Sequence, residues 1–184
     1  AGGEEVSARC VLSNVDPQRT YLGMVAESEL PDTFVRDIRA IQITSPVLKI
    51  NMAVDRLPQF SVLEGDDRQH HWGQTGGLFI GPTIDAMQLA CDQAKQGHAP
   101  DYPFFNIHMQ SAVDPTVAPE GKHTVSIFAQ YYPYELAEGS WETRRDEIAQ
   151  HALRRFAEYA PNVLDSVIAM QVLAPPDIEA RFGL

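Results

Sequence analysis

The chain has 184 residues, which fits one domain of ordinary size or two small ones. Hydrophobic residues make up 44% and charged residues 21%, as in soluble globular proteins, so a wholly disordered chain is excluded. Fourteen Lys and Arg stand against 25 Asp and Glu, and the resulting net charge of -11 repels phosphate backbones and anionic membranes. Nucleic acid is therefore not an expected partner. No apolar run is long enough to predict a transmembrane helix.

The cysteines and the two ends indicate a cytoplasmic type of protein and a piece of a longer one. Cys10 and Cys91 are too few for a disulfide framework and predict reduced, buried thiols. The first ten residues lack the features of a signal peptide, and the sequence does not begin with Met. The end of the chain coincides with the end of a short predicted helix at Gly183. We therefore expect flanking sequence on both sides.

The N-terminal quarter predicts one strand and two helices. Residues 6–13 are apolar enough for a short strand. Asp16 can then accept hydrogen bonds from free backbone N–H groups, and Pro17 suits the first position of a helix over 17–26. A second helix begins after Pro31-Asp32, and its apolar face carries Phe34, Ile38 and Ile41.

A clear period of two marks the next strand, over residues 44–55. The alternation places four apolar side chains on one face of this strand and more polar ones, including Lys49 and Asn51, on the other. Residues 56–81 are rich in Gly and polar residues and predict a loop. The four apolar positions of the 44–55 strand are Leu48, Ile50, Met52 and Val54.

The remaining sequence predicts helices and strands in alternation. The expected helices cover 83–96 and 141–159, and a last short helix follows Pro175-Pro176. The expected strands cover 103–110, 122–132 and 165–173, and the second of these is apolar on both faces in places, which favours a central position. The pattern predicts an α+β fold in which helices pack on one face of a mixed, mainly antiparallel sheet. On the helix expected over 83–96, the side chains expected to be buried are Ile84, Met87, Cys91 and Ala94.

Motifs for phosphate loops, zinc sites and nucleophilic serines are absent from the sequence. Two groups of residues remain as candidates for chemistry. Lys49 lies in the middle of a strong strand, where it either faces solvent or points into a cleft that lowers its pKa. Asn106, His108 and Gln110 share one face of the 103–110 strand, beside Gln130 if the two strands pair. Tyr131, Tyr132 and Tyr134 with Phe128 either line an apolar pocket or belong to the core.

Five blocks of the sequence resemble one family. They look like consecutive segments of phytoene dehydrogenase-related FAD oxidoreductases, distant relatives of amine oxidases, and most resemble the branch of pyridine nucleotide-disulphide oxidoreductase domain-containing proteins. The resemblance covers nearly the whole chain. The blocks are VLSNVDPQRTYLGMV, SPVLKINMAVDRLPQF, SAVDPTVAPEGKHTVSIFAQYYPYEL, SWETRRDEIAQHALRRFAEYAPNVLDSV and APPDIEARFGL.

The resemblance implies the substrate domain of a two-part flavoprotein, with the FAD-binding Rossmann domain absent from these residues. The expected partners are that missing domain, a small and mostly apolar substrate, and a second copy of the chain. Lys49 stands where amine oxidase relatives carry a strand lysine that holds a water near the flavin, so it is the catalytic candidate. The alternative is a non-catalytic module that binds an apolar ligand or a protein. The expected substrate-binding residues are Asn51, Asn106, His108, Gln130 and Tyr132.

Overall fold

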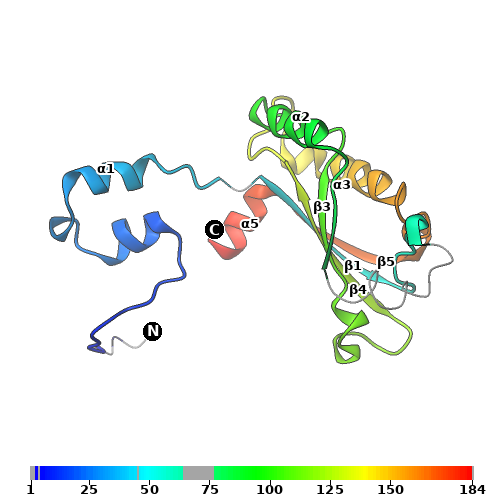
Figure 1. Cartoon of the computed structure of the whole chain (residues 1–184), viewed down its shortest axis with the longest axis horizontal. Coiled ribbons are helices and arrows are strands. Elements are labelled where there is room, and N and C mark those ends of the chain that lie inside the picture. The colour runs from blue at the N-terminus through cyan, green and yellow to red at the C-terminus, as the bar shows by residue number, and fades with distance from the viewer. Residues whose placement is uncertain (1–2, 4, 45, 64–76, 184) are drawn as a thin grey trace. The chain divides into compact units, whose positions relative to one another are not determined.

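The computed structural model describes residues 3, 5–44, 46–63 and 77–183 (Figure 1). The chain divides into two compact units, a smaller one over residues 1–43 and a larger one over 44–183. Among the described residues no helix is long and apolar enough to cross a membrane.

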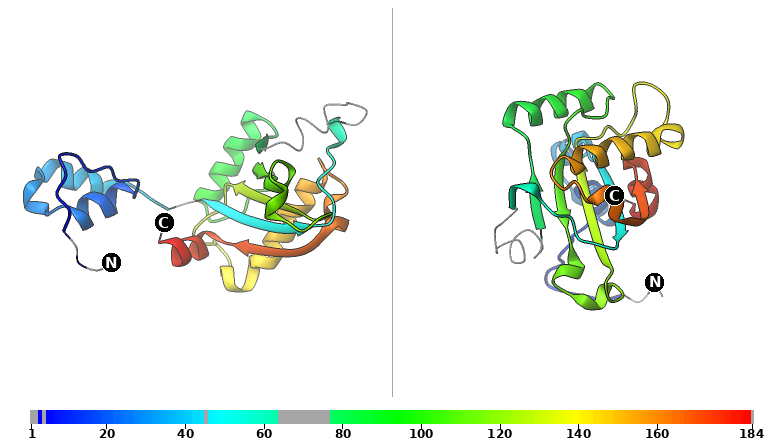
Figure 2. Two further views of the ribbon diagram at one scale, coloured as in Figure 1. Left: turned by 90° about the horizontal axis from the view of Figure 1, so that it is seen from below. Right: turned by 90° about the vertical axis from the view of Figure 1, so that its right-hand side faces the viewer.

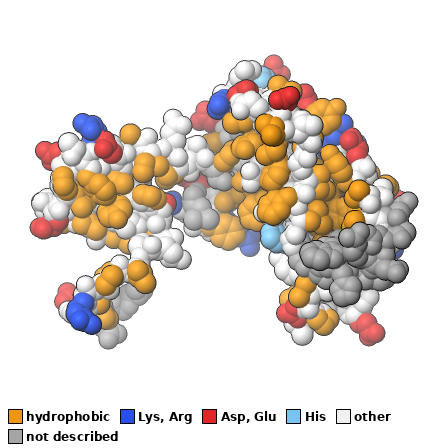
Figure 3. Space-filling model, viewed as in Figure 1, with side chains coloured by type: hydrophobic (Ala, Val, Ile, Leu, Met, Phe, Trp, Pro, Cys, Tyr) orange, Lys and Arg blue, Asp and Glu red, His pale blue; other side chains and the backbone are white. Residues whose placement is uncertain are grey.

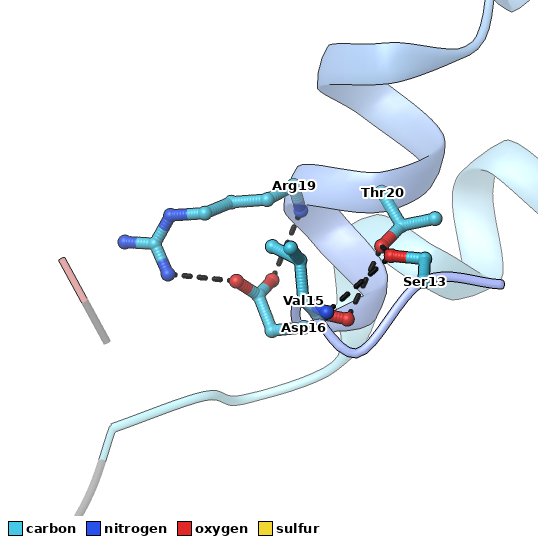
Figure 4. A network of polar contacts seen from close by, with 5 residues as sticks. All are labelled: Ser13, Val15, Asp16, Arg19 and Thr20. Atoms are coloured by element: carbon cyan, nitrogen blue, oxygen red, sulfur yellow. Dashed lines mark hydrogen bonds and ion pairs between the residues drawn. The ribbon is translucent and has the colours of Figure 1, made fainter.

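The smaller unit is helical, and its first helix is capped as the sequence predicts. A π-helical segment, η1 (Arg19–Met24), follows Asp16. The Asp16 carboxylate accepts hydrogen bonds from the Arg19 backbone N–H at 2.9 Å and from its guanidinium at 2.7 Å (Figure 4). The backbone bond, supported by the guanidinium, holds the pKa of Asp16 below its usual value. The strand expected over 6–13 is wrong, because these residues are exposed and pair with no described strand.

The second predicted helix is also present, as α1 (Asp32–Ala40). Its C-terminal carbonyl groups are satisfied by one side chain, since the Gln18 amide donates to the carbonyl oxygens of Ile38 at 3.2 Å and Ile41 at 2.7 Å. An edge-to-face contact between the rings of Tyr21 and Phe34, 4.9 Å apart, also joins η1 to α1. Small helices that are marginal alone thus stabilise each other.

The larger unit is built on one five-stranded sheet in the order β2-β3-β4-β1-β5, and every pairing between the described strands is antiparallel (Figures 1 and 2). This confirms the α+β class. The strand expected over 122–132 is central, as predicted. The strands are β1 (Val47–Val54), β2 (Gly77–Ile80), β3 (Phe104–His108), β4 (His123–Gln130) and β5 (Val167–Leu173).

One face of the sheet and the longest helix, α3 (Trp141–Ala157), share a single core. The Phe156 ring is fully buried there, 5.8 Å from the ring of Phe105 and 6.1 Å from that of Phe60. The expected period of two in β1 is confirmed, because its four apolar side chains are all buried. The described part of this unit also contains the shorter α-helices α2 (Ile84–Lys95), α4 (Val163–Ser166) and α5 (Pro175–Phe182), and three single-turn 3-10 helices, η3 (Ser61–Leu63), η5 (Gln110–Ala112) and η6 (Pro115–Val117).

Three local predictions differ from the structure. The loop expected over 56–81 lies partly outside the described residues, and its end forms the four-residue strand β2. Ile84 is 85% exposed at the first turn of α2, whose buried residue is Ala90. The thiols are not both buried, because Cys10 is exposed and Cys91 half-buried; both are free.

Candidate functional site on the open face of the sheet

The face of the sheet opposite the α3 core carries the predicted polar residues in ordered rows, and we call it the open face. The strand register defines these rows, since residues paired across antiparallel strands point to the same side. In one row Asn51 lies between Ser126 and Gln171, and His108 follows beyond Ser126.

The neighbouring row on the open face alternates apolar and polar side chains. Lys49 lies between Leu173 of β5 and Phe128 of β4, and Asn106 and Phe79 continue the row on β3 and β2. Within its own row the lysine therefore has two apolar neighbours. In the next row its neighbours are the amides of Asn51 and Gln171 and the hydroxyl of Ser126. Hydrophobic side chains are also visible on the surface of this unit in Figure 3.

A directional chain of hydrogen bonds joins the two rows. The Lys49 ammonium donates to Ser126 Oγ, and Ser126 Oγ donates to Asn51 Oδ1 at 3.1 Å. Asn51 Nδ2 in turn donates to Gln171 Oε1 at 3.3 Å. The bonds span β4, β1 and β5, and Ser126 of β4 is the residue that holds the Lys49 head group directly.

Burial lowers the pKa of Lys49 to about 8. The Lys49 Nζ lies 3.7 Å from the centroid of the Phe128 ring, and this contact and the bond to Ser126 both favour the ammonium form. Desolvation outweighs these contacts. The amine can therefore gain or lose a proton near neutral pH, as an acid–base group must.

We expect the Lys49 amine to titrate near pH 8, well below the ordinary value of 10.5. Because the folded-state pKa is depressed, the cost of burying the ammonium is fully present below pH 8 and disappears as the pH rises through the unfolded-state value. The sequence contains only three lysines, so NMR of isotope-labelled lysine side chains resolves each. A Lys49→Met variant assigns the signal. A midpoint at 10.5 would contradict a half-buried ammonium.

The other predicted site residues on strands lie on the same open face. Asn106 is half-buried in the Lys49 row, and its Oδ1 is buried without a partner among the described residues. His108 lies opposite Ser126, and Gln130 lies opposite Phe104. The structure thus places Asn51, Asn106, His108 and Gln130 on the same face of the sheet as the lysine. Ser126, which sequence reasoning missed, is the residue that joins Asn51 to the lysine through hydrogen bonds.

Tyr132 does not join this group. It follows the end of β4, where strand alternation no longer applies, and its ring is fully buried in the core, 6.5 Å from the ring of Trp141. Burial raises the pKa of its hydroxyl, which has no partner among the described residues. The sequence leaves two alternatives for the aromatic cluster, the lining of an apolar pocket or the core, and Tyr132 belongs to the core.

A pocket of about 650 Å³ opens on the same face beside the Asn51 row. It lies against β4, β1 and β5 and is bounded by the connection between β3 and β4, through Gln110 and Val117. Its size is typical of small-molecule sites. Among the described residues, no group of three potential metal ligands comes together.

The described residues do not fit the diphosphate of a dinucleotide. Such a group is held where a parallel βαβ unit turns from strand to helix. Here β2 and β3, which flank α2, run antiparallel, and so does every other described pair. The open face can cover an apolar ring but offers no cradle for phosphates.

The chain is similar over its whole length to two curated proteins, although no family model matches it. It is 40% identical over 188 residues to pyridine nucleotide-disulfide oxidoreductase domain-containing protein 2 of Rattus norvegicus, covering 100% of the chain and 32% of that protein. The Mus musculus protein of the same name is 40% identical over 187 residues, with 99% and 32% covered. The chain thus spans about a third of the length of relatives named for an oxidoreductase domain.

Proposed function

We propose that this chain is the substrate-binding portion of an FAD-dependent oxidoreductase of the phytoene dehydrogenase type, which acts on a mostly apolar substrate. The observation that carries the proposal is the half-buried Lys49 on an otherwise uncharged part of the open face. The relatives' name, which refers to an oxidoreductase domain, supports the same reading. In this proposal the open face covers the flavin ring.

The open face suits such a substrate because it combines apolar contact surface with one titratable amine. Phe128, 37% exposed, and Phe79, 66% exposed, present aromatic surface in the Lys49 row. Lys49 holds a water or a proton beside the reacting atoms, and Ser126 fixes its position. Bound FAD would accept the hydride.

The first test concerns the cofactor. Because the described residues offer no diphosphate site, residues 1–184 should purify without colour and show no saturable binding of FAD at micromolar concentration. A protein that spans the full length of the relatives should purify yellow, with flavin released on denaturation. A longer protein without flavin would reject the proposal of an FAD-dependent oxidoreductase and favour a non-catalytic binding module. Flavin bound to residues 1–184 alone would reject the proposal that this chain is only the substrate-binding portion.

A further inference from the structure

The pocket beside Asn51 owes its space to a row of small side chains. Ala53 lies between Ala169 of β5 and Thr124 of β4 in the strand register. Both alanines are exposed, so nothing from the described part of the sheet fills the space above them. The hollow lies directly next to the row of Gln171, Asn51 and Ser126.

Every side chain that lines the pocket is uncharged, although the protein carries a net charge of -11. The Lys49 ammonium bonds to Ser126 Oγ but is not part of the lining, so an anionic group would find no cation among the lining residues themselves, and a cationic group no carboxylate. Burying either ion against uncharged walls costs more than burying a neutral polar group that forms hydrogen bonds. The polar members of the lining are Asn51, Gln110, Thr124, Ser126 and Gln171.

Two of these polar side chains keep unused hydrogen-bonding capacity. The Thr124 hydroxyl oxygen is buried and has no partner among the described residues. Gln171 accepts a bond from Asn51 through Oε1, which leaves its Nε2 donors without a partner in the described structure. Buried polar groups normally have partners, so an unpartnered hydroxyl in a pocket indicates that a ligand or water supplies one.

We propose that this pocket is the subsite for an uncharged oxygen-bearing group, a hydroxyl or carbonyl, on an otherwise apolar substrate. The inference rests on the proposed function, because it names the substrate class of the same face. Thr124 and Gln171 bind the oxygen, the methyl groups of Ala53 and Ala169 contact the carbon skeleton, and the Lys49 amine marks the reacting end. The substrate is thus neither a carboxylic acid nor an amine.

The test compares three probes with the same eight-carbon chain at pH 7: 1-octanol, octanoate and octylammonium. Binding is followed by NMR through the side-chain NH₂ signals of Asn51 and Gln171. We expect octanol to bind about tenfold more tightly than either ion, since the ions must lose hydration against a lining that holds no charge of opposite sign. Thr124→Val and Gln171→Leu should each weaken octanol binding about fivefold. Ala53→Phe fills the hollow and should abolish it.

The control is Gln88→Leu, a matched change on the exposed surface of α2, which should leave binding unchanged. Tighter binding of octanoate, or octanol binding that survives Ala53→Phe, would overturn the proposal. If none of the three probes shows saturable binding, the proposal is also overturned. The open face would then be assigned to contact with another protein segment. Octanol binding requires no flavin, so a longer protein that purifies without flavin would reject the proposed function and leave this result standing.

Discussion

Replacing Lys49 with Met in a flavin-loaded protein of the relatives' length should slow flavin reduction by a factor on the order of 10 to 100, as expected when one acid–base or water-positioning group is lost. Methionine removes the amine and keeps much of the side-chain bulk, so contact with Phe128 is retained while the bond to Ser126 is lost. Stopped-flow measurement of flavin bleaching with the natural substrate gives the rate.

Stability separates this effect from a folding defect. The pKa of Lys49 is lowered by burial, so at neutral pH the protein buries an ammonium at a cost that Met does not carry. The variant should therefore melt no earlier than the parent at pH 7. Lys95→Met, on the exposed surface of α2, is the matched control and should reduce flavin at the parent rate. An unchanged rate in Lys49→Met would leave the site to Asn106, His108 and Gln130.

Phe156→Ala should destabilise the larger unit by about 3–5 kcal/mol, the usual cost of removing a buried aromatic ring and leaving a cavity. The ring is fully buried on α3 and contacts Phe60 and Phe105, so its loss leaves a cavity between the helix and the sheet. Since domains of this size unfold with about 5–15 kcal/mol, the variant should be near the limit of folding. Urea denaturation followed by tryptophan fluorescence measures the change.

The matched control is Phe182→Ala at the end of α5, where the ring is 58% exposed. This change should alter the free energy of unfolding by no more than about 0.5 kcal/mol, as surface substitutions do. Equal losses in the two variants would mean that α3 does not form the core with the sheet.

Sequence reasoning succeeded where a local pattern determines the structure. The alternation in 44–55 places Lys49 and Asn51 opposite the buried side chains of β1, because a strand's two faces follow from neighbouring residues alone. The central position of the 122–132 strand is predicted correctly, but only one of its faces is covered: Val125, Ile127 and Ala129 are buried, whereas Phe128 on the other face is 37% exposed.

Features that depend on contacts distant in sequence could not be predicted in this way. Ser126 is an ordinary polar strand residue until the register between β1 and β4 places it beside Lys49. Tyr132 was assigned to the site by its aromatic neighbours, but the strand ends at Gln130 and the following chain turns its ring into the core. Residues 6–13 are apolar enough for a strand, but no described strand pairs with them.

The position of β5 at the edge of the sheet has a consequence for handling the protein. The strand pairs with β1 on one side, and no described strand pairs with the other. Its sequence, VIAMQVL, contains no charge, proline or glycine, the features by which proteins usually block edge-to-edge strand addition. At neutral pH the net charge of -11 keeps molecules apart. Near the isoelectric point of about 4.8 that repulsion vanishes, and we expect the protein to aggregate there by strand addition at the edge of β5.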